Sequence, residues 1–371
     1  MHVVVTCRST AYKDRTALGK NFREVRVLPL DAKHVESLVV QAYKHLYHHD
    51  PKLCQNKTIE LLDGIRHLEE QRRQRFGENT EPLVTSPLLV RMLLVVHFSE
   101  RQLPEQRAEL YMKATDAMLL PEYAPDEEIA NRIGRLVGGS REVHRDLVQH
   151  LAFAMHSRGE KLGREISEDD LRAVLRQNPA YATAIDDFIA LTRLRGTLLE
   201  ERFGVYRFIH LAFQEYLAAR YLAEIKRGES GVEGIAAFLE SGPILESWWR
   251  EPVLLVAGYL SVTSPQTAQL FLQRLSGTDD QAHTRHRNLT AEVQMAAAEV
   301  AATACLEVPA SPESLRKQLA ERLAALFGQI DLMAQVQPVR RAAASEAMAR
   351  LGDPRVEVMT VDKMHFCLVP A

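Results

Sequence analysis

Residues 197–223 read TLLEERFGVYRFIHLAFQEYLAARYLA, and this stretch decides the fold of the middle of the chain. Its first half alternates apolar and polar residues around Gly204, as in a β-hairpin. A helical pattern follows at once and runs from His210 to about Lys226. We expect His210 to lie within the first turn of that helix. The residues expected to pair in the hairpin are Leu198, Leu199, Tyr206 and Phe208.

Three helices are expected before this hairpin, at residues 142–156, 168–177 and 182–193. Three helices followed by a hairpin make a winged-helix-like unit. We therefore predict such a unit at residues 141–226.

The chain before this unit begins with strands and continues as helices. Short β-branched runs at residues 3–6 and 25–28 predict strands, the first of them buried as in a parallel sheet. Asp50-Pro51 reads as a breaker that ends the first helix. Ser86 reads as an N-cap with Pro87 at the first helical position. The expected helices are residues 35–49, 58–74, 87–98 and 104–119.

Apolar helices also dominate the part of the chain after the winged-helix-like unit. We expect them at residues 244–260, 266–275, 291–306, 312–327 and 338–351. Because the loops are short, stacked helix pairs are the expected arrangement. Such stacking should bury Leu254, Leu255, Leu270, Val300 and Leu319. The closing MHFCLVPA reads as one further strand.

Composition excludes several function classes. Aromatic residues make up only 6%, which favours helices over a β-sandwich. The 46 basic and 49 acidic residues nearly cancel, so nucleic acid is not expected as a partner. No window approaches 18 uncharged apolar residues, so no membrane span is expected. The four cysteines form no CxxC pair and fit a reducing cytoplasm.

Few motifs point to chemistry. The chain carries no GxxxxGK[ST] phosphate loop, the motif with which P-loop enzymes hold ATP for hydrolysis. His45 and His49 share a helix face and could hold a metal, but a surface cluster is the preferred interpretation. Arg8 follows the strand at residues 3–6, where a planar cation could reach a phosphate. His210 lies beside a helix N-terminus, which attracts anions.

Four stretches carry a family resemblance. They are VVVTCRSTAY at 3–12, FREVRVLPLD at 22–31, the SPLLVRMLLVVHF segment that runs through LPEQRAELY at 86–119, and YRFIHLAFQEYLAARYLA at 206–223. Together they resemble the NACHT family of signal-transduction NTPases, the STAND class, in its bacterial form. The fourth stretch is close to the family's winged-helix signature FxHxxFQEYLAA and is the most specific. VRRAAASEAMARLGDPR at 339–355 resembles a HEAT-type repeat, and FCLVPA at 366–371 resembles the start of a formylglycine-generating, sulfatase-modifying-type domain.

The resemblance implies a mainly α chain with a domain organisation of five parts. Residues 1–34 would be the end of the α/β nucleotide-binding domain, and 35–140 the NACHT helical segment. The winged-helix-like domain at 141–226 and a HEAT-like helical array at 227–352 would follow. Residues 353–371 would be a linker and the start of the sulfatase-modifying-type domain. On this interpretation the chain is a fragment.

The resemblance also implies three residues that bind nucleotide. Arg8 matches the sensor arginine that faces the terminal phosphate, and Pro87 matches the proline that lies against adenine. His210 matches the histidine that contacts the β-phosphate of ADP and holds the closed state. The complete protein would cycle between an ADP-held closed form and an ATP-bound form that self-associates, as in bacterial defence. This chain is expected not to hydrolyse ATP and to bind nucleotide weakly, with no catalytic residue and no metal site.

Two other functions stay open. The helical array could be a scaffold that binds a protein partner without nucleotide. The winged helix could instead bind DNA, although its candidate recognition segment, ATAIDDFIALTR at 182–193, is acidic and apolar and fits phosphates poorly.

Overall fold

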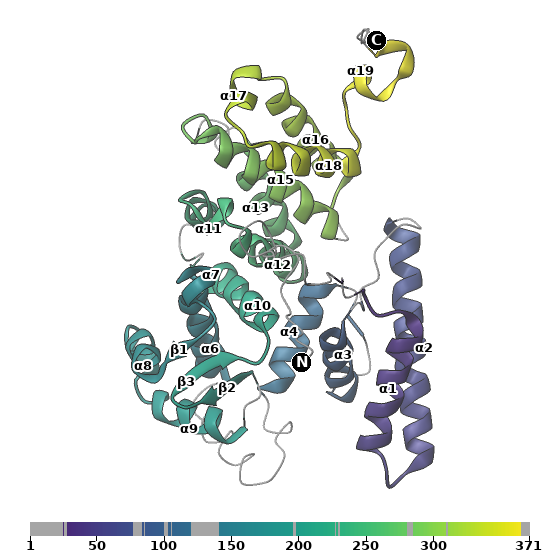
Figure 1. Ribbon diagram of the computed structural model, residues 1–371, viewed down its shortest axis with the longest axis vertical. Coiled ribbons are helices and arrows are strands. Elements are labelled where there is room, and N and C mark those ends of the chain that lie inside the picture. The colour runs from purple at the N-terminus through teal and green to yellow at the C-terminus, as the bar shows by residue number, and fades with distance from the viewer. Residues whose placement is uncertain are drawn as a thin grey trace. The chain divides into compact units, whose positions relative to one another are not determined.

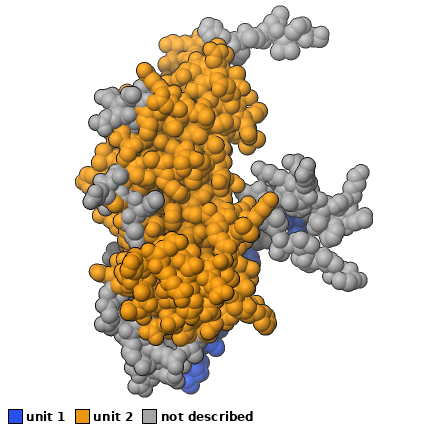
Figure 2. Space-filling model, turned by 90° about the vertical axis from the view of Figure 1, so that its left-hand side faces the viewer, with its two compact units in different colours: residues 1–69, 81–91 blue, residues 70–80, 92–371 orange. Residues whose placement is uncertain are grey.

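The computed structural model describes residues 25, 28–76, 84, 86–99, 103–104, 106–119, 141–195, 198–226, 228, 231–279, 285–308 and 311–364. The chain divides into two compact units, residues 1–69 with 81–91 and residues 70–80 with 92–371 (Figures 1 and 2). The predicted mainly α fold with a small sheet is confirmed. The strand expected at residues 3–6, Arg8 and the closing FCLVPA lie outside the described residues. Val25 and Leu28, at the ends of the second expected strand, are exposed and not in a strand.

The first unit contains α1 (Ala32–Leu46) and most of α2 (Pro51–Phe76). The Asp31 side chain caps α1 by accepting the backbone N–H of His34. The expected start of the second helix at residue 58 is wrong. Asp50 accepts the backbone N–H of Leu53 at 3.0 Å, so Asp50-Pro51 begins α2 as well as ending α1.

Two further helices precede the winged-helix part. α3 (Pro87–Ser99) begins in the first unit and ends in the second, and α4 (Arg107–Met118) lies in the second. Ser86 Oγ accepts the backbone N–H of Leu89, which confirms the predicted N-cap of α3. α4 packs against α12 and α10, two helices described below.

The winged-helix part of the second unit surrounds a three-stranded antiparallel sheet (Figure 1). Leu199 pairs with Phe208 and Glu201 with Tyr206, so the predicted hairpin is confirmed. Leu198 lies just before the strand, and its carbonyl accepts the backbone N–H of Ile209. The elements are α6 (Arg141–His156), α7 (Gly159–Leu162), β1 (Ile166–Ser167), α8 (Glu168–Arg176), the 3-10 turn η3 (Pro179–Tyr181), α9 (Ile185–Arg195), β2 (Leu199–Arg202) and β3 (Val205–Phe208).

Two details of this part differ from the prediction. β1 was not expected, because it is a two-residue strand that is defined by its pairing with β3, Ile166 with Tyr206 and Ser167 with Val205. α9 begins at Ile185 and not at residue 182, because the 3-10 turn η3 and residues 182–184 intervene.

α10 (Leu211–Tyr221) is the central helix of the second unit. It packs against α6 on one side and α12 on the other. Phe213, Tyr216 and Leu217 are almost wholly buried. The helix continues as a π-helical turn, η4 (Leu222–Lys226), so the predicted end near Lys226 is confirmed.

The remaining helices form layers in which α12 contacts α13 and α15, and α15 contacts α16 and α18. Leu254, Leu255, Val300 and Leu319 are buried as predicted. The prediction for Leu270 is wrong, because this side chain is 56% exposed, whereas the neighbouring Phe271 is buried. The elements are α11 (Gly231–Glu240), η5 (Pro243–Leu245), α12 (Ser247–Thr263), α13 (Pro265–Ser276), α15 (Ala291–Glu307), α16 (Glu313–Phe327), α17 (Ile330–Ala334), α18 (Pro338–Leu351), α19 (Val356–Met359) and η6 (Val361–Lys363).

Candidate functional site

His210 lies where β3 ends and α10 begins. Its backbone is extended (φ −147°, ψ 138°), and its Nδ1 atom accepts a 3.1 Å hydrogen bond from the backbone N–H of Ala212. His210 is therefore the N-cap of α10, and the helix begins at Leu211, one position later than predicted. An imidazole nitrogen that accepts carries no proton, so the neutral ring holds its proton on Nε2. The cap thus places the proton of this exposed side chain on Nε2.

The N-terminus of α10 is suited to anions. The helix dipole is positive at this end, and α10 has no acidic side chain in its first turn. The backbone N–H groups of Ala212 and Phe213 already donate to the His210 Nδ1 atom and to the His210 carbonyl. The dipole is therefore the feature of this helix end that favours an anion.

The carboxylate of Glu168 and its partners fix the hairpin that leads to His210. Glu168 begins α8, and its side chain accepts hydrogen bonds from Arg172 at 3.1 Å and from the Tyr206 hydroxyl at 3.2 Å. It also pairs with Arg193 of α9. Partial burial raises the pKa of Glu168, but the hydrogen bonds from Arg172 and Tyr206 outweigh this and leave it below its usual value. One ionised side chain therefore joins α8, α9 and β3.

A buried polar network joins the other end of α10 to the helices around it. The Arg220 side chain is 4% exposed and pairs with Asp116 of α4 at 2.8 Å and with Glu224 of η4 at 3.2 Å. Glu224 also accepts hydrogen bonds from Gln149 of α6 and from the Tyr259 hydroxyl of α12. Burial alone would raise the pKa of Glu224, but Arg220 and these donors lower it overall.

His156 and Trp248 form a second rigid contact between α6 and α12. The Nε2 atom of His156 bonds the Trp248 carbonyl at 3.0 Å, and the indole N–H of Trp248 donates to the His156 carbonyl at 2.9 Å. The two rings stack with centroids 4.4 Å apart. Since His156 is fully buried in this reciprocal contact, we assign it a structural role.

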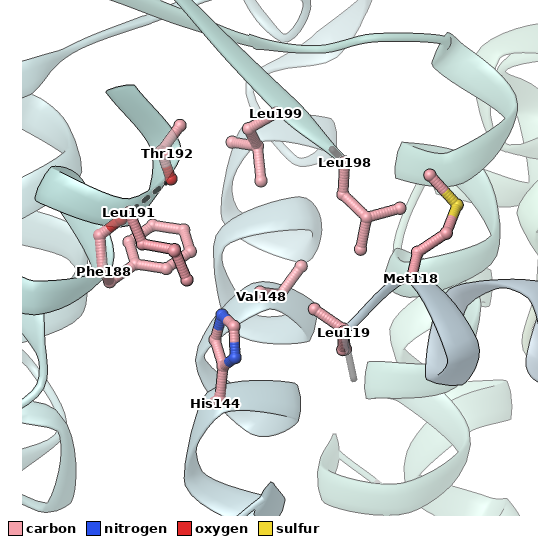
Figure 3. A pocket seen from close by; sticks show the side chains of 9 residues that line it. All are labelled: Met118, Leu119, His144, Val148, Phe188, Leu191, Thr192, Leu198 and Leu199. Carbon is pink, nitrogen blue, oxygen red and sulfur yellow. Dashed lines mark hydrogen bonds between the residues drawn. The ribbon is translucent and has the colours of Figure 1, made fainter. Parts of the chain in front are cut away.

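The small cavity between α4, α6, α9 and β2 is a packing gap. Figure 3 shows the side chains that turn toward one another there, with His144 among mostly apolar groups. Its volume is about 20 Å³, enough for one water molecule and far too small for a nucleotide. The His144 ring lies edge-on to Phe188 with centroids 5.8 Å apart.

The described structure does not test whether the three residues expected to bind nucleotide share a pocket. Arg8 lies outside the described residues. Pro87 is the exposed first residue of α3 in the first unit, and His210 belongs to the second. A shared pocket for these residues stays a prediction.

Three histidines at the end of α1 and in the turn after it lie close together among the described residues of the first unit. His48 Nδ1 lies 3.1 Å from the His45 carbonyl, and the rings of His48 and His49 are in contact. No group of three side chains suited to a metal occurs among the residues that the structure describes.

Residues 107–222 match the family model described as a winged helix-turn-helix domain C-terminal to NACHT. This stretch is similar to the winged-helix regions that follow a NACHT domain. The match begins with α4, ahead of the boundary at residue 141 that the sequence suggested, and ends one residue after α10. No curated protein matches the chain. Within the described ranges, no helix has the length and apolarity that crossing a membrane requires.

Sequence reasoning found His210 but missed the residues that hold its surroundings. Glu168 carried a usable signal, since an acid at the first position of a helix with Arg172 one turn later is a stabilising pattern. Arg220 carried part of such a signal, since Glu224 lies one turn later, but its other partner, Asp116, lies far away in the sequence.

Proposed function

We propose that this chain supplies the winged-helix side of a nucleotide-controlled signalling switch of the NACHT type. In this proposal His210 contacts a phosphate of ADP and holds a closed form, and ATP favours a form that self-associates. The observation that carries the proposal is the position of His210 at the N-cap of α10, where its Nδ1 accepts the Ala212 N–H and the neutral ring holds its proton on Nε2. The match of residues 107–222 to a NACHT-associated domain supports it.

The contacts available on this chain make the proposed affinity low. A charge-assisted hydrogen bond contributes about 1.5–3 kcal/mol, whereas association costs at least about 4 kcal/mol. Two such contacts and one stacking proline, from Arg8, His210 and Pro87, correspond to a Kd near the millimolar range. Tight binding and ATP hydrolysis would need a phosphate loop and a magnesium site beyond these residues. A role in bacterial defence belongs to the same proposal through the resemblance alone.

Isothermal titration of the whole chain with ADP tests the proposal. We expect weak binding, and about tenfold weaker binding for His210→Asn, since one charge-assisted contact of about 1.4 kcal/mol is lost. Asparagine keeps the N-cap, so the change removes only the imidazole. His49→Asn, at an exposed turn position, is the matched control and should bind as the wild type does. Equal binding by His210→Asn and the wild type would contradict the proposal.

A protein-binding scaffold is the second candidate function, and one observation favours it. The array carries an open groove of about 200 Å³ between η5, α12, α15 and α18. DNA binding has no such support. The candidate recognition helix α9 has Asp186 and Asp187 in its first turn, where they would repel phosphates.

A further inference from the structure

Phe203 at the tip of the β2–β3 hairpin is the most exposed large apolar side chain among the described residues, with a relative exposure of 104%. Its backbone is in the left-handed region, with φ 55°, and Gly204 follows at φ 78°. Two-residue hairpin turns of this kind favour Asn-Gly, because asparagine tolerates positive φ and a bulky residue does not. The tip therefore holds a strained aromatic residue where neither folding nor solvation favours one.

The turn is fixed in this conformation. The Gly204 N–H donates to Glu201 Oε1 at 2.6 Å, and the Gly204 carbonyl accepts the backbone N–H of Glu168 at 3.2 Å. No atom lies within 4 Å of the position that a Gly204 Cβ would take, so the tip is surrounded by open space. A rigid, projecting aromatic residue is the type of side chain that anchors protein interfaces.

The charges of the hairpin argue against nucleic acid as the ligand. Glu200 pairs with Arg202 at 3.0 Å and also with Arg207. With Glu201, the hairpin carries two acids and two bases, so it has no excess positive charge for phosphates. An apolar pocket on a protein is the surface that Phe203 fits.

The array of the same chain carries such a pocket. The groove of about 200 Å³ has an apolar lining that includes Trp249, Val253, Val300 and Val339. A cavity of about 150 Å³ lined by apolar side chains is known to hold benzene, so a phenyl ring fits this volume. Val339 is 74% exposed, which leaves the groove open to solvent.

The charged residues at the groove match those of the hairpin tip. Arg250 pairs with Glu299 at 2.7 Å, and Arg340 pairs with Glu292 at 2.8 Å. Glu246 is an exposed acid at the groove edge. Arg202, the residue before Phe203, has a side chain that is 66% exposed, so the hairpin tip and the groove edge each carry an exposed charge and the two charges are opposite.

We infer that Phe203 of one copy of this chain inserts into the groove between η5, α12, α15 and α18 of a second copy. The hairpin and the elements that line the groove belong to the same compact unit, and β2 and β3 lie well apart from α15 and α18 in Figure 1, so the hairpin tip meets the groove only between copies. Such a contact is heterologous and continues from copy to copy. This inference rests on the self-association in the proposed function and names its surfaces.

Sedimentation velocity across the micromolar to millimolar range tests the contact with two variants. Phe203→Asn removes the anchor and relieves the backbone, so it should keep or raise the melting temperature while abolishing association. Val339→Glu blocks the groove, and an acid in the first turn of α18 suits its helix dipole. Each variant alone should be monomeric. Leu162→Asn, at another exposed position, is the control and should associate like the wild type.

An equimolar mixture of the two variants gives the decisive result. Phe203→Asn keeps an intact groove and Val339→Glu keeps an intact Phe203, so the mixture should form dimers and nothing larger. Failure of the mixture to dimerise, or association of Phe203→Asn like that of the wild type, would overturn the inference. A wild type that stays monomeric throughout would overturn it too. Each of these results leaves the ADP titration of His210 to decide separately on the nucleotide role.

Discussion

At the scale of the residue, His210 has two roles that substitutions can separate. His210→Ala removes the acceptor for the Ala212 N–H and should lower the free energy of unfolding by about 1 kcal/mol. His210→Asn restores a capping side chain and should stay within a few tenths of a kcal/mol of the wild type. Urea denaturation measures both values. An equal loss in the two variants would show that the cap does not stabilise α10.

Sequence reasoning could identify His210 because it relied on local patterns, a hairpin followed by a helix start. It could not predict how the imidazole ring is oriented, since the use of Nδ1 as the cap acceptor depends on the backbone angles of His210 between β3 and α10. The conformation of Phe203 could not be predicted from the sequence either, because phenylalanine disfavours the left-handed conformation that the turn imposes.

At the scale of the element, the close approach of α4 and α12 limits substitution. A Cβ on Gly258 would lie 2.8 Å from Ala108 Cβ, so Gly258→Ala should overpack the contact and destabilise by about 1–3 kcal/mol. In a helix without this contact, the same change would stabilise by up to about 1 kcal/mol.

The double variant Gly258→Ala with Ala108→Gly serves as the control for this contact. It exchanges the two side chains across the interface, so it should recover most of the stability lost by Gly258→Ala. Thermal and urea unfolding of the single and double variants give the coupling free energy between positions 108 and 258. Additive effects would contradict the close packing of α4 on α12.

The network around Glu224 should make stability depend on pH. Its pKa is lowered in the folded chain, so folding favours the ionised form. This contribution is complete above the pKa of the unfolded chain, near 4.5, and is lost as the pH falls through the lower folded value. Near neutral pH, Glu224→Gln should cost about 2 kcal/mol, because charge-assisted hydrogen bonds from Arg220 and Tyr259 are weakened.

Urea denaturation at neutral and acidic pH compares Glu224→Gln with the wild type. The difference between the two should shrink as the pH falls below 4.5. Glu346→Gln, on the exposed face of α18, is the control and should cost little at any pH. A constant difference for Glu224→Gln across this range would show that its ionisation is not coupled to folding.

Elements were predictable where their pattern is local. The hairpin, α6, α10 and the array helices follow from spacing, whereas β1 depends on the distant partner Tyr206. The expected burial of Leu270 was wrong because an apolar residue type alone does not show which face of α13 packs against the core.

At the scale of the whole molecule, the second unit combines the winged-helix region with the helical array. Arg107 of α4 pairs with Glu251 of α12 at 2.7 Å and reaches Glu307 of α15 at 3.7 Å. With the Arg220 network, these contacts couple α10 to the array. A ligand that acts on His210 would therefore act on a helix packed into the rest of the unit, which is what a switch requires.

The side-chain nitrogen spectrum of His210, recorded by NMR during titration with ADP, tests the central claim most directly. We expect the tautomer with the proton on Nε2, and an Nε2 signal that moves on addition of ADP or inorganic phosphate but stays in place with adenosine. His210→Asn identifies the signal by its loss. A proton on Nδ1, or an Nε2 signal that does not respond to ADP at millimolar concentration, would contradict the account.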